Sequence, residues 1–570
     1  MAEQLYFSRD TRMFVQFRDS GDNDETTANL GKGGIWEIPV LDGYSFSQTT
    51  NTSEITLAEM ESTAGISRRG RRMFTDSLAP AEWSFSTYIR PFKSLGGSVA
   101  TGYLGADGTG TDVHAVEEVL WASMFGADTW SGLAGNNSEF TRTTNPKVSG
   151  GDVLTPAANY SNIEMTESNR SALNSFTLWF WIDTATSNPL MYRLPESVVN
   201  EVSIDFDVDG IATLNWTGFS KEVQDYSGNV IEGTSAPAYN ATTKDGGAIT
   251  RGDVFVDTDN ANGRAFHLVL GNTSESGASS GVVTITQAID EATNSTKNFI
   301  RNRLTSVEIE AAVATDKVPT IFPGNHDVIT TLDDGTDDRI TVTGHGFTTG
   351  DQVYITGCTN VTDLNGTHHF VNVVDSNNIK LYTTKAHAET GHASTGLVAI
   401  PADGSYTDDS GTIANGKYNL VLTGGNFTIG NNITYLVPEE LGAINKPLEH
   451  VTGTRSATGT ATCYITLNDS DLTNGTSRQF FNDLVSESAM GKVVNKFKVT
   501  MYIGGKTAAD DDTVQPDPAF AITFPTCHIT VPTHQVEDII SLETSFEALP
   551  TDFGAADEIS QIRYYPPSSY

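Results

Sequence analysis

The sequence predicts a mainly β protein made of two tandem copies of one β domain, with a small all-β domain inserted into the second copy. Short apolar segments alternate with clusters of Gly, Ser, Thr, Asn and Asp, which is typical of strands joined by turns. The same order of segments occurs twice along the chain. With 570 residues, the chain is also too long for a single hydrophobic core, and its length predicts about three to four domains.

The first copy is predicted over residues 1–222. Its strands show apolar and polar residues in alternation, and its helix carries Val116, Val119, Leu120 and Met124 on one side. In chain order, we expect strands at 11–20, paired strands over 35–56, a strand at 81–92, a helix at 113–125, and strands at 175–184 and 196–219.

The second copy is predicted over residues 298–313 and 414–570, and its segments follow the same order. Tyr464 aligns with Tyr88 in the matching strand, and residues 530–549 align with residues 193–212 so that Pro532 falls on Pro195. In order, the repeated segments are 301–312, 417–436, 460–467, the helix 479–490, 496–505 and 530–549.

Two stretches lie outside the repeat. Residues 223–297 are predicted to be a polar linker or insertion with strand-like islands at 252–258, 265–270 and 281–286. Residues 314–413 are predicted to form the inserted small β-domain, with its compact unit over 329–400. They interrupt the second copy where the first has only a short polar link, so we expect an insertion at the tip of a hairpin.

The charge of the chain restricts its partners. It has 34 Lys and Arg against 71 Asp and Glu, a formal net charge of −37. Nucleic acids and membrane surfaces are anionic, so this charge argues against binding either. It is compatible with a protein that DNA must pass without adhering, or with a soluble protein from a salty environment. The sequence contains no run of about 18 apolar residues, so no membrane span is predicted.

Cysteine use indicates a reducing compartment. The three cysteines, Cys358, Cys463 and Cys527, cannot form a paired framework, and two of them lie in strand-like runs where small buried thiols are common.

One local motif is similar to an enzyme site. Residues 323–327 (PGNHD) resemble part of a two-metal phosphoesterase site, and Asp112 with His114 supplies an Asp-x-His on the predicted helix. That chemistry needs further ligands that hold two ions about 3.5–4 Å apart, and the remaining ligand blocks are missing. The triplet Arg251–Asp253 (RGD) is an equally weak signal. We therefore predict no enzyme, no catalytic or metal-binding residue and no cofactor.

A longer block identifies a family. Residues 67–89 (SRRGRRMFTDSLAPAEWSFSTYI), together with residues 431–438 (NNITYLVP) in the second copy, resemble the major tail tube protein of T-five-like long-tailed bacteriophages. The resemblance covers roughly residues 8–222, 298–313 and 416–560. It implies two tube domains in one chain and trimeric rings that imitate six-fold rings.

The resemblance also implies a location and partners. We expect a virion tail component, assembled in the host cytoplasm, that binds itself as stacked homotrimer rings and meets the tape measure, tail terminator and hub proteins. DNA is expected to cross the lumen without specific binding, and no membrane contact is expected. Two alternatives stay open: a tail hub or distal tail protein, and a host-surface-binding adhesin that uses the inserted unit.

Two sets of residues are candidates for function. Basic residues in the loops between paired strands are expected to contact the next ring, the alternative being a solvated loop: Arg68, Arg69, Arg71 and Arg72, with Lys446 and Arg455 in the second copy. Acidic residues at period two over 201–209 are expected to face the lumen, the alternative being an acidic outer face: Glu201, Asp205, Asp207 and Asp209.

Overall fold

The computed structural model has many strands in several antiparallel sheets and few, short helices, which confirms the mainly β prediction. The α-helices in the part of the chain that it describes are α1 (Glu118–Met124), α2 (Lys385–Thr390) and α3 (Ser477–Val485). The described residues are 5–17, 35–54, 72–93, 113–125, 147–148, 151–152, 154–156, 161–163, 173, 175–182, 190–207, 209–227, 230–233, 254–257, 265–269, 282–284, 286–287, 299–311, 327–333, 338–365, 367–391, 394–400, 411–415, 417–420, 422–438, 446–466, 476–485, 497–504, 518–536, 539–550 and 557–566.

Seven strands of the first half pair antiparallel in a continuous series. Their alternating sequences place one side chain in two against the core, as in β6, where Trp83 and Phe85 are buried and Ser84 and Ser86 point the other way. In pairing order, the strands are β2 (Ile35–Ile38), β1 (Thr11–Phe17), β13 (Phe176–Ile182), β14 (Leu190–Asp207), β15 (Thr213–Ser220), β6 (Ala81–Tyr88) and β3 (Ser45–Ser47).

Seven strands of the second half pair in the same way. In the corresponding order, they are β30 (Lys417–Leu420), β22 (Ser306–Ala311), β35 (Phe497–Ile503), β36 (Ala519–Ile529), β38 (Ile540–Ala548), β34 (Ser456–Tyr464) and β31 (Leu422–Gly430).

The register of the two series also agrees. In β13–β14, Phe176 faces Ser197, and an irregularity precedes the pair Leu178–Leu194. In β35–β36, Phe497 faces Cys527, and an irregularity precedes the pair Val499–Phe524. In the strands after them, Tyr88 faces Thr213 and Tyr464 faces Ser541. The strand pairing thus agrees with the predicted alignment of Tyr464 with Tyr88.

One predicted alignment is wrong. Pro195 follows Leu194, and Pro525 follows Phe524 at the corresponding place in β36. Residues 519–529 therefore correspond to the first part of β14, and β38 corresponds to β15. The match of residues 530–549 with 193–212 was one strand out of step, because both segments combine a proline with alternating apolar residues.

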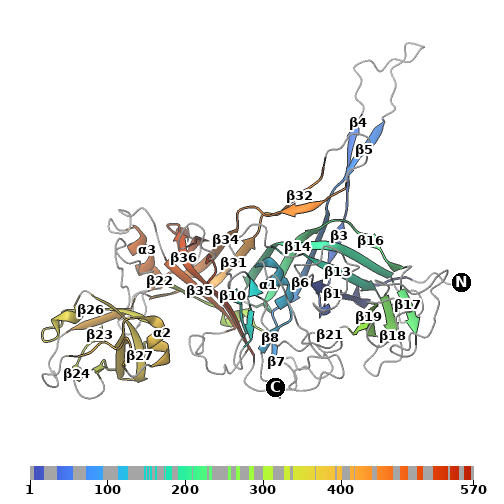
Figure 1. Cartoon of the computed structure of the whole chain (residues 1–570). Coiled ribbons are helices and arrows are strands. Elements are labelled where there is room, and N and C mark those ends of the chain that lie inside the picture. Colours follow the sequence, from blue (N-terminus) through green and yellow to red (C-terminus); the bar gives the residue numbers. More distant parts are fainter. Residues whose placement is uncertain are drawn as a thin grey trace, which may run out of the picture.

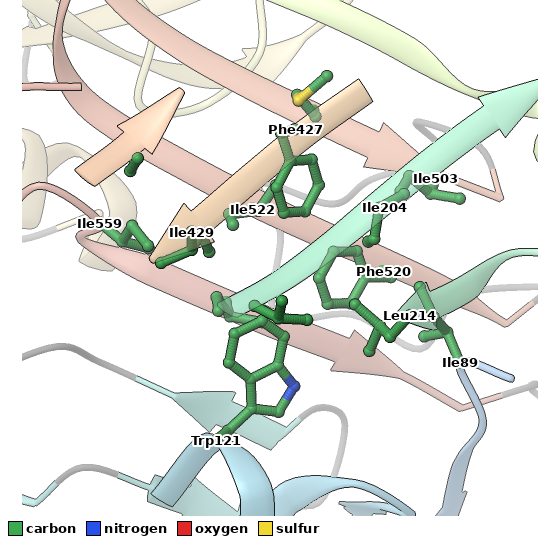
Figure 2. Packing of buried hydrophobic residues seen from close by; sticks show 14 of the residues in the cluster. Ile89, Trp121, Ile204, Leu214, Phe427, Ile429, Ile503, Phe520, Ile522 and Ile559 are labelled. Carbon is green, nitrogen blue, oxygen red and sulfur yellow. The ribbon is translucent and has the colours of Figure 1, made fainter. Parts of the chain in front are cut away.

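The two halves share one sheet and one core. The second part of β14 pairs antiparallel with β31, from Glu201–Gly430 to Asp207–Gly424; we call this strand pair the seam. A single cluster of buried side chains spans both halves. Figure 2 shows Ile204 and Leu214 of the first half close to Phe427 and Phe520 of the second. Burial of such side chains contributes roughly 1.5–3 kcal/mol each.

A C-terminal strand adds a second link between the halves. Strand β39 (Gln561–Tyr565) pairs with β36 on one side and with β12 (Ser161–Ile163) on the other. Short strands extend the main sheet by pairing with its longer strands. They are β11 (Leu154–Pro156), β16 (Gln224–Asp225), β21 (Thr286–Gln287) and β37 (Thr533–Val536).

Helix α1 is shorter than the predicted helix 113–125. Residues Val113–Ala115 form β8, which pairs with β7 (Pro91–Lys93), so His114 lies on a strand and its predicted helical position is wrong. All four predicted apolar positions of this segment are buried, but Trp121 and Phe125 are buried as well. The segment is enclosed on several sides rather than on one stripe, which a one-sided pattern could not indicate.

The region predicted as a polar linker contains a sheet. Its strand-like islands form β18, β19 and β20, and an additional strand, β17, pairs parallel with β18. The four strands are β17 (Val230–Gly233), β18 (Val254–Asp257), β19 (Ala265–Val269) and β20 (Val282–Thr284).

The inserted segment forms a separate sheet with its own core, centred on residues such as Ile340, Val353 and Ile413. It lies between β22 and β30, which pair directly with each other, and Figure 1 shows it as the yellow unit set apart from the first half. Helix α2 contacts β27 and β28 of this sheet. Its described strands are β23 (Asp327–Val328), β24 (Thr331–Asp333), β25 (Arg339–Thr341), β26 (Gln352–Thr356), β27 (His368–Asp375), β28 (Asn378–Tyr382) and β29 (Thr412–Asn415).

Two hairpins leave the main sheet. The first joins β4 (Thr50–Glu54) to β5 (Met73–Leu78), and Figure 1 shows it extending away from the other strands. The second joins β32 (Thr434–Leu436) to β33 (Glu449–Val451). A further short hairpin joins β9 (Lys147–Val148) to β10 (Gly151–Asp152). No helix among the described residues is long and apolar enough to cross a membrane.

Candidate channel and assembly surfaces

One face of the shared sheet is polar across both halves. On β14, Val202, Ile204 and Phe206 enter the core, whereas Asp205 is exposed and Glu201 is half-buried on the opposite face. The registers carry this face continuously from β3 through β6, β15, β14, β31 and β34 to β38.

Hydroxyl and amide groups cover most of that face. They bond to one another between strands: Ser45 Oγ lies 2.8 Å from Ser84 Oγ, and Ser86 Oγ donates to Asn215 Oδ1 at 2.7 Å. In the second half, Thr460 Oγ1 donates to Asn426 Oδ1 at 3.1 Å. Such pairs satisfy part of the hydrogen-bonding capacity of these side chains within the sheet.

The charged groups on this face all have one sign. The seven strands from β3 to β38, counting β14 from Val198 onward, contain no Lys and no Arg. Their carboxylates are Glu82, Glu201, Asp205, Asp207, Glu543 and Glu547. A surface of this kind gives a polyanion no cation to bind.

The predicted acidic run ends earlier than expected. Strand β14 ends at Asp207, whose backbone pairs with Gly424, and Asp209 lies in the following turn rather than on the strand. The exposed carboxylate of Asp209 is 4.0 Å from Arg303 Nη1. The sequence pattern therefore predicted the alternation correctly from Glu201 to Phe206, and the assignment of these residues to a lumen stays a prediction.

The first hairpin carries the predicted basic loop. Arg68, Arg69 and Arg71 lie outside the described residues, and Arg72 is exposed just before β5. The side chains of Met73 and Phe74 are each 59% exposed. These exposed apolar side chains make the hairpin a candidate contact surface.

The two predicted basic residues of the second copy have contacts within the chain. Lys446 Nζ lies 3.1 Å from Glu222 Oε2, and Arg455 is half-buried before β34. Burial opposes ionisation of Glu222, but hydrogen bonds from Gln224 and Lys446 outweigh it and lower its pKa. Lys446 thus links the second half to the first, and an additional inter-ring contact by these residues stays a prediction.

The second hairpin is attached to the first half by specific bonds. The Ile433 amide donates to Asn200 Oδ1 at 2.8 Å, and Asn431 Nδ2 donates to the Met124 carbonyl at 3.1 Å. The Tyr435 hydroxyl donates to the Glu196 carbonyl. Burial lowers the pKa of the neighbouring His450. This hairpin therefore belongs to an interface between the two halves.

A buried polar cluster was not predicted. Trp121 Nε1 donates to Tyr564 Oη at 2.6 Å, and Tyr564 Oη donates to Glu117 Oε1 at 2.7 Å. Burial raises the pKa of Glu117 to about 8. The consecutive glutamates 117 and 118 within an apolar run were a possible signal of buried carboxyl groups.

The enzyme-like motifs do not form a site in the described structure. Residues 323–326, Asp112 and the RGD triplet lie outside the described residues, and Asp327 lies in β23. His369 Nε2 lies 2.7 Å from Thr367 Oγ1. Within the described ranges, no three His, Cys, Asp or Glu side chains are grouped as metal ligands.

Comparison with known proteins identifies a relative of this chain. No family model matches the chain. The tail tube protein pb6 of Escherichia phage T5 is 35% identical to it over 162 residues, which are 27% of this chain and 32% of the relative. Over that region the chain is homologous to a phage tail tube protein. The chain thus matches about a third of the relative's length.

Over the matched region, this homology bears out the resemblance to a tail tube protein that residues 67–89 and 431–438 predicted. A tail tube protein is a structural component of a virion tail, so the homology also agrees with the predicted structural, non-enzymatic role.

Proposed function

We propose that this chain is the structural subunit of a phage tail tube, located in the virion tail, and that it forms stacked rings around a channel for DNA. The observation that carries the proposal is the polar sheet face without Lys or Arg, which extends over both halves of the chain. The homology to a tail tube protein supports the same function.

The physical reason lies in the charge of DNA. Duplex DNA carries one phosphate charge per about 1.7 Å of its axis, and a protein that neutralises several phosphates binds it tightly. A channel wall of hydroxyl, amide and carboxylate groups offers no such neutralisation. DNA would therefore cross it without specific binding.

The repeated pairing order supports trimeric rings. Each half supplies one equivalent set of strands, so three chains would supply six positions around the axis, and ring formation would complete the sheet as a barrel. The tape measure, tail terminator and hub proteins are the expected partners at the ends of the tube. The inserted unit would lie on the outside of the barrel.

Electron microscopy of the purified chain and of virions tests the function. The proposal expects hollow tubes, and antibody against the chain should label the tail along its whole length. A tail hub would instead be labelled at one end only, in a few copies. Label at one end, or on fibres that leave the tail, would contradict a tube subunit.

A further inference from the structure

The seam gives the geometry by which one copy of this sheet joins the next. Its residues alternate in the usual way: Ser203–Thr428 and Asp205–Asn426 lie on the polar face, and Ile204–Phe427 lies in the core. Here the second part of β14, the fourth strand of the first series, meets β31, the last strand of the second series.

Each seam strand has a counterpart at the opposite end of the sheet. Ser203 faces Asn215, which in turn faces Ser86. Thr533 of β37 faces Glu543, which faces Thr462, and Thr462 corresponds to Ser86 in the alignment of Tyr464 with Tyr88. Strand β37 is therefore the counterpart of the seam part of β14.

Strand β3 is the counterpart of β31. Phe46 faces Trp83, and Phe427 faces Gly459, the residue that corresponds to Trp83. Each of the two counterpart strands has one edge without a described partner strand: β37 is paired along β38, and β3 is paired along β6.

All four residues of β37 are exposed, and exposed apolar side chains occur at its end and just after it. The exposed fractions are 78% for Val536, 61% for Ile539 and 45% for Ile540. An open strand edge with apolar side chains favours pairing with another strand.

We propose that β37 of one copy pairs antiparallel with β3 of the next copy in the register of the seam. The inference rests on the proposed function, because this head-to-tail contact must close into a ring. The pairs between neighbouring chains are Thr533–Ser47, His534–Phe46, Gln535–Ser45 and Val536–Tyr44.

The side chains match this register on the polar face. Thr533 and Gln535 meet Ser47 and Ser45 on the polar side. A slip by one residue would move every one of these side chains to the wrong face.

On the core side, a size exchange supports the same register. In the seam, Phe206 lies over Gly425, where a Cβ atom would be 2.7 Å from its ring. At the proposed contact the small residue is Val536 and the large one is Tyr44. One large and one small side chain thus fill the corresponding place in both contacts.

The hairpins fit the same arrangement. Thr434 faces Val451, and at the corresponding place Ser53 faces Phe74. The second hairpin is attached to the first half through Ile433 and Tyr435. By the same relation, the first hairpin would lie on the second half of the neighbouring chain. That contact would cover Met73 and Phe74 of the hairpin.

Cysteine cross-linking tests the register in assembled particles. The variant Ser47→Cys with Thr533→Cys replaces two exposed residues. The matched control is Ser203→Cys with Thr428→Cys, which stands at the same place in the seam but within one chain. A second control, Ser47→Cys with His534→Cys, is out of register by one residue. The three native thiols are buried.

Under mild oxidation, the first pair should give multimers on a non-reducing gel, ending at a closed covalent ring. The seam pair should give only a cross-linked monomer, and the slipped pair should give at least tenfold less multimer. Mixing the two single variants, Ser47→Cys and Thr533→Cys, should give a heterodimer.

Failure of the register and failure of the function give different results. Tubes in which the seam pair closes but the proposed pair does not would overturn the register and leave the tube function in place. Cross-linked rings that never stack into tubes would support the register and count against the function.

Discussion

The hydroxyl group of Tyr564 donates a hydrogen bond of 2.7 Å to the carboxyl group of Glu117, 447 residues away in the chain. Tyr564 belongs to β39, which also pairs with strands of both halves. The second carboxyl oxygen of Glu117 is buried without a hydrogen-bond partner. Burial of this group disfavours the ionised form of the carboxyl group.

The variant Glu117→Gln tests this protonation. Burial raises the pKa of Glu117 from its ordinary 4.5 to about 8, although Tyr564 and Arg90 oppose the change and Glu118 adds to it. As pH rises, the unfolded chain loses this proton first. The stability that the proton contributes is complete below pH 4.5 and is lost by about pH 8.

Between those two values, the wild type should lose about 1.4 kcal/mol per pH unit through this group. Glu117→Gln cannot ionise, so its free energy of unfolding relative to the wild type should rise between pH 5 and pH 8. Chemical denaturation at pH 5, 7 and 9 measures the difference. A parallel pH dependence of the two proteins would show that Glu117 is already ionised at neutral pH.

The basic loop of the first hairpin should act in stacking. Replacement of Arg68, Arg69, Arg71 and Arg72 by Ser should leave a folded protein that forms short tubes. Each exposed ion pair contributes about 0.2–1 kcal/mol, and the loss accumulates over every ring. Tube lengths in micrographs measure the effect, and the four-Lys variant is the control that keeps the charge. Tubes of normal length from the Ser variant would rule out this role.

The inserted unit should be dispensable for assembly. Glu310 faces Lys417 across β22 and β30, so a short Gly/Ser link can replace residues 312–416 and close a hairpin there. Tubes should form with the normal repeat and a thinner outer profile. Loss of tube formation by a variant that still unfolds cooperatively would place the unit in the ring contact.

The channel prediction concerns DNA release. Replacement of Glu201 and Asp205 by Lys should slow DNA ejection from virions, because the new cations bind phosphate, and the delay should shrink at high salt. The control replaces Asp363 and Glu389, two exposed residues of the inserted unit, by Lys. Equal release rates for both variants would show that the β14 face is not the channel wall.

The repeat could be predicted from the sequence because strand alternation and turn residues are local properties. The alignment of Tyr464 with Tyr88 was correct for this reason. The match of residues 530–549 with residues 193–212 was wrong, because two successive segments of the second half each combine a proline with alternating apolar residues. The helix 113–125 was too long, since Val113–Ala115 pairs with β7, and that contact is not local.

The candidate surfaces were only partly predictable. The alternation around Asp205 was visible, but the strand end at Asp207 depends on pairing with Gly424. The seam itself, and the bond from Tyr564 to Glu117, join residues hundreds of positions apart. No periodicity in one segment indicates which distant strand will lie beside it.

The symmetry of an averaged tube cross-section is the most direct test of the account. Electron cryomicroscopy of tubes formed by this chain should show three chains per ring with pseudo-six-fold symmetry, and β14, β31, β37 and β3 should follow one another around the channel. True six-fold symmetry with six chains per ring would contradict it.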